Sequence, residues 1–124
     1  MESIKVESTP YLPLIDFTPE GILKLEGRAI PEDANKLFDP LIAFVQQISV
    51  KEVLLDINLD YFNTSSSKKI LDLLRALDAN DKVESILVNW HFEEGDDDSV
   101  ETAEIYEELL NRTHFRYIQY AEAA

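Results

Sequence analysis

The sequence contains no cysteine, and its 124 positions hold only three glycines and eleven basic residues. Without cysteine the chain has no disulfide, no thiolate ligand for a metal and no thiol nucleophile. Its glycines, Gly21, Gly27 and Gly95, stand too far apart to build a phosphate-binding P-loop or a dinucleotide-binding fingerprint. These absences exclude several common catalytic and nucleotide-binding sites.

Acidic residues outnumber basic ones, since 25 Asp and Glu stand against 11 Lys and Arg. The formal net charge is therefore −14 and the pI is near 4.3. A surface of this charge repels the phosphates of nucleic acids and of anionic membranes. Hydrophobic residues nevertheless make up 45% of the chain, which is enough for a folded core. We therefore expect one domain, residues 1–124, whose partners are proteins, a small ligand or a metal rather than nucleic acid or membrane.

Long apolar runs are missing as well. The longest candidate, residues 41–50, is much shorter than the roughly 18 residues of a membrane span and is typical of the end of an amphipathic helix. Charged residues interrupt the first twenty positions, which therefore do not form the apolar part of a signal peptide. The sequence predicts a cytoplasmic protein.

Hydrophobic periodicity divides the chain into alternating strands and helices. Polar residues on one face of both long strands favour helices mainly on the other face of the sheet. The order β-β-α-β-α-β-α-β predicts an α/β fold with a mixed sheet of about five strands. The expected strands are two short ones within 8–26, then 53–62, 85–92 and 115–120, and the expected helices begin near Pro31, Ser65 and Asp98.

Two local features qualify this pattern. Pro40 interrupts the helical spacing of its segment, which predicts a kink or a late start of the regular helix. In the strand 53–62, strict alternation places Tyr61 on the apolar face.

The segment 93–108 carries nine carboxylates and no base. It lacks the alternating ligands and central glycine of an EF-hand loop. One interpretation is a solvated loop whose acids favour a helix start, with Asp98 or Ser99 as the N-cap. The other is weak, non-specific binding of divalent ions. We assign neither a metal site nor a cofactor.

The two histidines, His91 and His114, match no helical zinc motif. A Ser–His–Asp triad assembles in space rather than in sequence, but no serine here has the glycines of a nucleophile elbow. A hydrolase or metal enzyme that uses His91 remains one rival hypothesis. Another is a constitutive binding module that uses the mixed strand face around Asn58, Asp60, Asn89 and His91.

Four hydroxyl residues in a row, 64–67, stand where the central strand gives way to the next helix. One explanation is structural: Asn63 or Thr64 caps the helix, and the remaining serines are tolerated there for their local hydrogen bonding. The functional alternative is phosphorylation, which adds roughly −1.5 to −2 charges. The helix start accepts a phosphate at little cost, whereas an acidic or apolar partner meets repulsion and desolvation there.

The segment 59–69, LDYFNTSSSKK, resembles the signature of the SiaC family of small regulatory phosphoproteins. Residues 31–34 (PEDA), followed by Leu37-Phe38, are similar to that family's lead into its first helix. Residues 90–92 (WHF), the acids after them and 107–109 (EEL) are similar to its C-terminal half. The resemblance implies the fold of the anti-sigma-factor antagonists, the STAS type, and a regulator that is not an enzyme.

The resemblance also implies how such a regulator works. Thr64, the threonine of NTSS, is then the residue phosphorylated by a protein kinase of the histidine-kinase-like ATPase fold and restored by a PP2C-like phosphatase. The unphosphorylated form binds and activates a diguanylate cyclase, which links it to cyclic-di-GMP signalling and biofilm behaviour. The alternative is a STAS-like binding module that acts on another effector in a partner-switching pathway.

We expect partners to bind around Thr64. Lys68 is a better candidate than Lys69 for steadying a phosphate, because it lies four residues after Thr64 on the same helical face. The predicted partner-binding residues are Asp60, Tyr61, Asn63, Ser65, Ser66, Lys68 and Lys69.

Overall fold

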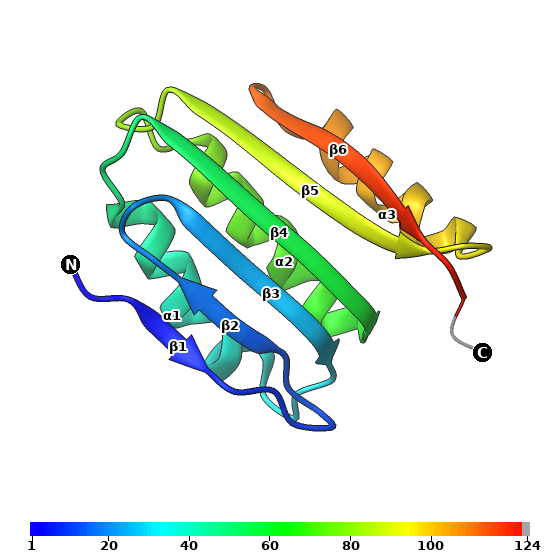
Figure 1. The fold of residues 1–124 in the computed structure, drawn as a ribbon. Helices are drawn as coiled ribbons and strands as arrows, with labels where there is room; N and C mark the ends of the chain where they lie inside the picture. The colour runs from blue at the N-terminus through cyan, green and yellow to red at the C-terminus, as the bar shows by residue number, and fades with distance from the viewer. Residues whose placement is uncertain (123–124) are drawn as a thin grey trace.

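The computed structural model describes residues 1–122, which form a six-stranded sheet with helices packed against it (Figure 1). The order of the strands in the sheet follows their order along the chain. The elements are β1 (Ile4–Val6), β2 (Leu14–Phe17), β3 (Ile22–Ala29), α1 (Ala34–Gln47), β4 (Glu52–Phe62), α2 (Thr64–Asp78), β5 (Ser85–Glu93), α3 (Asp97–Glu108) and β6 (Thr113–Tyr120).

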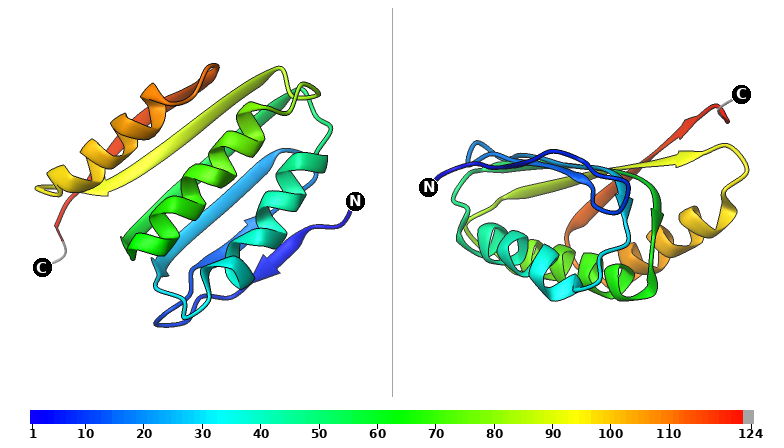
Figure 2. Two further views of the ribbon diagram at one scale, coloured as in Figure 1. Left: turned by 180° about the vertical axis from the view of Figure 1, so that it is seen from behind. Right: turned by 90° about the horizontal axis from the view of Figure 1, so that it is seen from below.

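The sheet is mixed: β1, β2 and β3 pair antiparallel, whereas β3, β4, β5 and β6 pair parallel. The helices that connect the parallel strands lie on one face, so the other face is left uncovered (Figure 2). This confirms the predicted α/β fold with helices on one side. The strand count was one too low, because β1 has only three residues, two of them exposed, and carries no periodicity of its own. Among the described residues, no helix is both long and apolar enough to cross a membrane.

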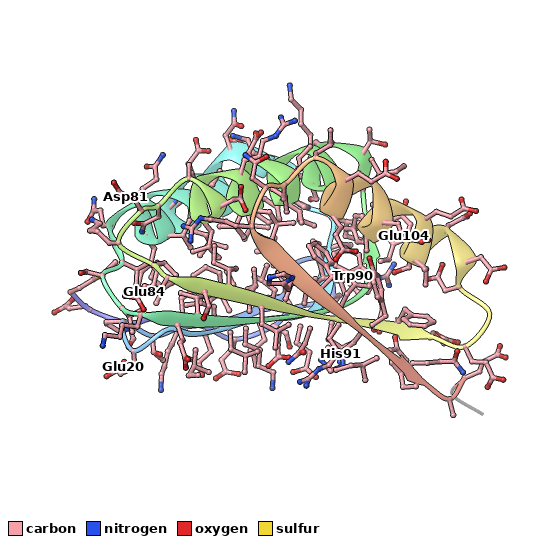
Figure 3. The ribbon with its side chains drawn as sticks, turned by 90° about the horizontal axis from the view of Figure 1, so that it is seen from above. Glu20, Asp81, Glu84, Trp90, His91 and Glu104 are labelled. Atoms are coloured by element: carbon pink, nitrogen blue, oxygen red, sulfur yellow. The ribbon has the colours of Figure 1, made fainter. Side chains whose placement is uncertain are left out.

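The core lies between the sheet and the helices, and Trp90 of β5 stands at one end of it. Its side chain points toward the helices, whereas that of His91 points to the uncovered face (Figure 3). The indole is 1% exposed and packs edge-on against Phe62 and Tyr106, with ring centroids 6.1 and 5.9 Å away. Its Nε1–H donates to Ser99 Oγ at 2.9 Å, which ties α3 to the sheet. Burial of an aromatic side chain of this kind stabilises the fold by about 1.5–3 kcal/mol.

A bulge near the end of β4 corrects the predicted orientation of Tyr61. The pairing of β4 with β3 shifts between Gly27, opposite Leu59, and Arg28, opposite Tyr61. The extra residue on β4 reverses the alternation, so Tyr61 is 54% exposed and Phe62 packs against the core. The prediction that Tyr61 faces the core was wrong because the bulge depends on the neighbouring strand.

The starts of α1 and α3 also differ from expectation. Asp33 caps α1 by accepting the Lys36 N–H at 3.2 Å, and the helix continues through Pro40, so the predicted late start was wrong. Pro40 is exposed, where water can bond to the carbonyl that lacks its helical donor. Asp96, rather than Asp98 or Ser99, caps α3 by accepting the Ser99 N–H at 3.1 Å.

Glu107 of α3 lies against β6, the last strand of the sheet. Its carboxylate accepts the backbone N–H of Phe115 at 3.3 Å and the hydroxyl of Tyr117 at 3.0 Å. Partial burial, followed by the hydrogen bond and the charge of Glu107, raises the pKa of Tyr117 above its ordinary value. The phenol therefore stays a neutral donor and keeps α3 on the strand.

Asp78, the last residue of α2, joins that helix to the start of β6. Its carboxylate accepts the Thr113 hydroxyl at 2.7 Å and the backbone N–H groups of Arg112 and Asn111 at 3.0 and 3.1 Å. Partial burial raises the pKa of Asp78, but these hydrogen bonds and the Arg112 charge outweigh that effect and hold the pKa below its ordinary value.

We expect Asp78→Ala to lower the free energy of unfolding by about 2 kcal/mol at neutral pH, because three donors lose their acceptor. The folded-state pKa is depressed, so this stability is present above the unfolded pKa, about 4, and is lost as the pH falls through the folded value. Urea unfolding should therefore show the difference between wild type and variant narrowing below about pH 4. A difference that stays constant over that range would show that the carboxylate charge contributes nothing.

Candidate functional site

The hydroxyl-rich segment lies at the carboxyl end of β4, where the chain turns into α2. Asn63 has extended backbone angles, and its side-chain oxygen accepts the Ser66 N–H at 3.0 Å and the Ser65 hydroxyl at 3.2 Å. Asn63 is therefore the N-cap, as expected for one of the two candidates. Thr64 follows as the first residue of the helix, where backbone N–H groups have no partner within the helix.

Asn63 also fixes this turn to the neighbouring strand. Its backbone N–H donates to the carbonyl of Ala29 at 3.1 Å, and its side-chain amide reaches the carbonyl of Pro31 at 3.5 Å. Because β3 and β4 are parallel, their carboxyl ends meet at the same edge of the sheet. The turn is thus held against the connection between β3 and α1.

The four hydroxyl residues have different surroundings. Thr64 and Ser65 are exposed, but the Ser65 hydroxyl is bonded to the cap. Ser66 is fully buried, so its side chain does not reach the surface, and within residues 1–122 its hydroxyl has no hydrogen-bond partner. Ser67 is half-buried beneath α3. Among the described residues, Thr64 alone in this run combines an exposed side chain with a hydroxyl free of internal hydrogen bonds.

Of the two lysines beyond the turn, one is engaged. Lys69 Nζ lies 2.7 Å from Asp39 Oδ1 of α1 and is largely covered. Lys68 is exposed and has no ion-pair partner in the part of the chain that the structure describes. Lys68 is therefore the lysine that is available to an anionic group on Thr64. Helical spacing also favours Lys68 over Lys69 for this role.

Acidic side chains lie on the other flank of the turn. Asp60, Asp96 and Asp98 line a hollow of about 260 Å³ between the end of β4 and the start of α3. The Tyr120 hydroxyl donates to Asp60 at 3.4 Å, and partial burial followed by the Asp60 charge raises the pKa of Tyr120. Asp60 and Tyr61 are both exposed here, within a few residues of Thr64.

Tyr106 connects the first turn of α2 to α3. Its hydroxyl donates to the Ser67 carbonyl at 2.7 Å and lies 2.7 Å from the Ser67 hydroxyl. Burial raises the pKa of Tyr106, and the Ser67 hydroxyl opposes part of that rise. Sequence reasoning missed this contact, because the apolar stripe of α3 predicts Tyr106 as a core residue and gives no sign of its partner.

Two pairs of polar residues lie on the uncovered face. His91 Nε2 lies 3.2 Å from Asp56 Oδ1, and Arg116 Nε donates to Asn89 Oδ1 at 2.9 Å. Within residues 1–122, no hydroxyl group is hydrogen-bonded to His91. In the same residues, no group of three or more His, Asp or Glu side chains is arranged to hold a metal ion.

Comparison with known proteins shows the family to which the chain with this turn belongs. The model of the SiaC family, described as regulatory phosphoproteins, matches residues 6–120 and so includes the whole site. The chain belongs to the SiaC family. The chain is also similar to an uncharacterized protein of Pseudomonas aeruginosa strain UCBPP-PA14, with 28% identity over 113 residues, which cover 87% of this chain and 90% of the relative.

Solved structures of SiaC from Pseudomonas aeruginosa have the same fold. One is 26% identical and superposes with a TM-score of 0.76, covering 98% of this chain and 100% of that one. Apo-SiaC is 29% identical and superposes with a TM-score of 0.72; the match covers 95% of this chain and 99% of that one. A third structure holds the diguanylate cyclase SiaD in complex with its activator SiaC; the match is 27% identical with a TM-score of 0.78, covering 94% of this chain and 99% of the other.

We expect Asn63→Ala to lower the free energy of unfolding by about 1 kcal/mol, because the N–H of Ser66 loses its acceptor at the helix start. The matched control is Asn63→Asp, which keeps the acceptor and places a negative charge at the positive end of the helix. Urea unfolding of both variants tests the cap. Equal destabilisation by the two substitutions would show that the contact with Pro31, not the cap, carries the stability of this turn.

Proposed function

We propose that this chain is a non-catalytic regulatory phosphoprotein that is reversibly phosphorylated on Thr64 and binds a diguanylate cyclase when unphosphorylated. One observation carries the proposal: Thr64 is exposed, unengaged within the described chain and first in α2, in the NTSS sequence on which the resemblance to the family rests. The cyclase is supported by the complex in which SiaC is the activator of SiaD, because this chain matches that SiaC over 94% of its length.

The surroundings of Thr64 favour a phosphate that leaves the fold intact. A phosphate there lies at the positive end of the α2 dipole, an effect of about 0.3–1 kcal/mol. Exposed Lys68, one helical turn further on, supplies a cation on the same face. The modification therefore changes the charge of a surface and leaves the core unperturbed, which is what reversible control of binding requires.

The enzymes that add and remove the phosphate need access to Thr64. Its exposed place at the start of the helix supports such access. The resemblance to the family implies that the kinase has the histidine-kinase-like ATPase fold and that the phosphatase is PP2C-like. The surface residues proposed to meet these partners are Asp60, Tyr61, Asn63, Ser65, Lys68 and Lys69. Ser66, which is buried, supports the turn from inside.

The uncovered face of the sheet supports a second candidate, a constitutive binding module. The pairs His91 with Asp56 and Arg116 with Asn89 give this face a fixed arrangement of polar groups. Such a module binds its effector whatever the state of Thr64.

Incubation with ATP and a kinase of the SiaC system is expected to add one phosphate, which mass spectrometry locates on Thr64. Thr64→Ala should remain unmodified, because the acceptor hydroxyl is gone. Ser65→Ala is the matched control and should be phosphorylated like the wild type. Full modification of the Thr64→Ala protein would assign the phosphate to another residue.

Binding to SiaD of Pseudomonas aeruginosa, measured by calorimetry, tests the switch. Thr64→Ala should bind like the unmodified chain, whereas Thr64→Glu should bind at least about tenfold more weakly, a loss of about 1.4 kcal/mol. Thr64→Gln, similar in shape to the glutamate but uncharged, separates charge from size. Equal affinity of the alanine and glutamate variants would favour the constitutive module.

A further inference from the structure

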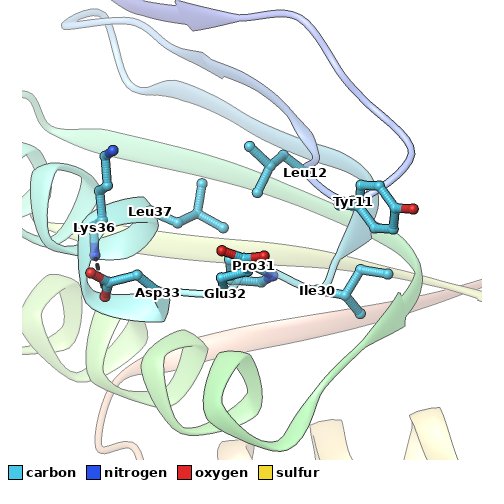
Figure 4. Close-up of a pocket in the computed structure, with 8 residues that line it drawn as sticks. All are labelled: Tyr11, Leu12, Ile30, Pro31, Glu32, Asp33, Lys36 and Leu37. Carbon is cyan, nitrogen blue, oxygen red and sulfur yellow. Dashed lines mark hydrogen bonds between the residues drawn. The ribbon is translucent and has the colours of Figure 1, made fainter.

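A groove of about 980 Å³ lies between the segment that leads into β2 and the start of α1 (Figure 4). Tyr11 and Leu12 form one wall, and Ile30 and Leu37 contribute to the other. Tyr11 is 64% exposed, the highest value among the large apolar side chains of residues 1–122. The groove therefore offers apolar surface that this fold leaves open.

Hydrogen bonds from three backbone N–H groups hold the walls of the groove. Thr9 Oγ1 accepts the N–H groups of Tyr11 and Leu12 at 3.2 and 2.9 Å, which fixes the loop before β2. The N–H of Ile30 donates to the carbonyl of Tyr11 at 2.9 Å and joins the two walls. The groove is thus already formed in the free chain, and little ordering is needed when a partner binds.

The groove adjoins the Thr64 turn. Pro31, which also lines it, has its carbonyl 3.5 Å from the side-chain amide of Asn63, and the preceding carbonyl of Ala29 accepts the Asn63 N–H. Thr64 is the next residue along the chain. A segment seated in the groove over Pro31 therefore lies close to the turn that Asn63 and Thr64 form.

Charges on the rim indicate what the groove accepts. Glu32 and Asp33 are exposed, and neither forms an ion pair within residues 1–122. Lys36 is the one base among the lining residues, in a chain with a net charge of −14. Complementary charge and an apolar floor together favour an occupant that is apolar on one side and basic on the other.

We propose that this groove docks a cationic amphipathic segment of the regulated effector, with its apolar side chains in the groove and its Lys or Arg residues at Glu32 and Asp33. The identity of the occupant as the effector rests on the proposed function of Thr64. A phosphate on Thr64 weakens docking, because the apolar side of the segment desolvates the added charge. The basic residues of the segment lie at Glu32 and Asp33 and not at the phosphate, so they offset only part of that cost.

The docking chemistry is tested without the effector, on the full chain. The probe is a short amphipathic peptide of Leu and Lys at physiological salt, and a Leu and Glu peptide of equal length is its control. Nuclear magnetic resonance should show saturable shifts of the Tyr11, Leu12 and Leu37 amides with the Lys peptide only. Shifts spread evenly over the surface, or equal binding of the Glu peptide, would overturn the proposal. Concentration-dependent shifts of the same amides without peptide would overturn it in favour of a second copy as the occupant.

Variants locate the site. Leu12→Asp should lower the affinity for the Lys peptide at least about tenfold, and Tyr11→Ser, at an exposed position that leaves the fold intact, should lower it severalfold. The matched control is Ile105→Asp, which changes another apolar side chain, 57% exposed on the acidic helix α3. It should bind like the wild type. Loss of binding in the Ile105 variant with retention in both groove variants would move the site to α3 and refute this assignment.

The same variants with SiaD separate the two proposals. If Thr64→Glu weakens SiaD binding and the groove variants do not, the switch stands and the groove proposal fails. If the groove variants lose the Lys peptide but Thr64→Glu binds it as tightly as Thr64→Ala, the groove stands as a docking site and its control by Thr64 fails. Weaker binding of both SiaD and the peptide by the groove variants and by Thr64→Glu supports both proposals.

Discussion

The parallel pairing of β3 with β4 determines where every candidate feature of this protein lies. It brings the carboxyl ends of both strands to one edge of the sheet, where Asn63 can bond to the carbonyls of Ala29 and Pro31. The position of the Thr64 turn next to the apolar groove follows from that contact. An antiparallel pairing of the same strands would place the groove and the threonine at opposite ends of the sheet.

The sequence was informative where structure depends on neighbours along the chain. Alternation over 53–62 predicts β4, and the polar residues before a helical pattern predict a cap at Asn63 or Thr64, of which the structure has Asn63. The sequence was uninformative where the local structure depends on pairing with a strand that is distant along the chain. The bulge that exposes Tyr61 needs the register with β3, and β1 is a strand only because it pairs with β2.

The same distinction separates the predicted and the missed parts of the site. The hydroxyl run indicates the turn, but only packing shows that Ser66 is buried and that Ser67 meets Tyr106, 39 positions further along. The groove was missed for a related reason. Tyr11 stands in a segment that its prolines mark as irregular, and its wall forms only through the hydrogen bond from Ile30.

The contact between Glu107 and β6 has a consequence for solubility. A long terminal strand rich in aromatic residues invites another chain to pair with it and extend the sheet, which is a common route to aggregation. Because the Glu107 carboxylate already occupies the Phe115 N–H, an incoming strand finds this donor taken and meets a negative charge. The acidic helix thus protects part of the β6 edge of the sheet against pairing with another chain.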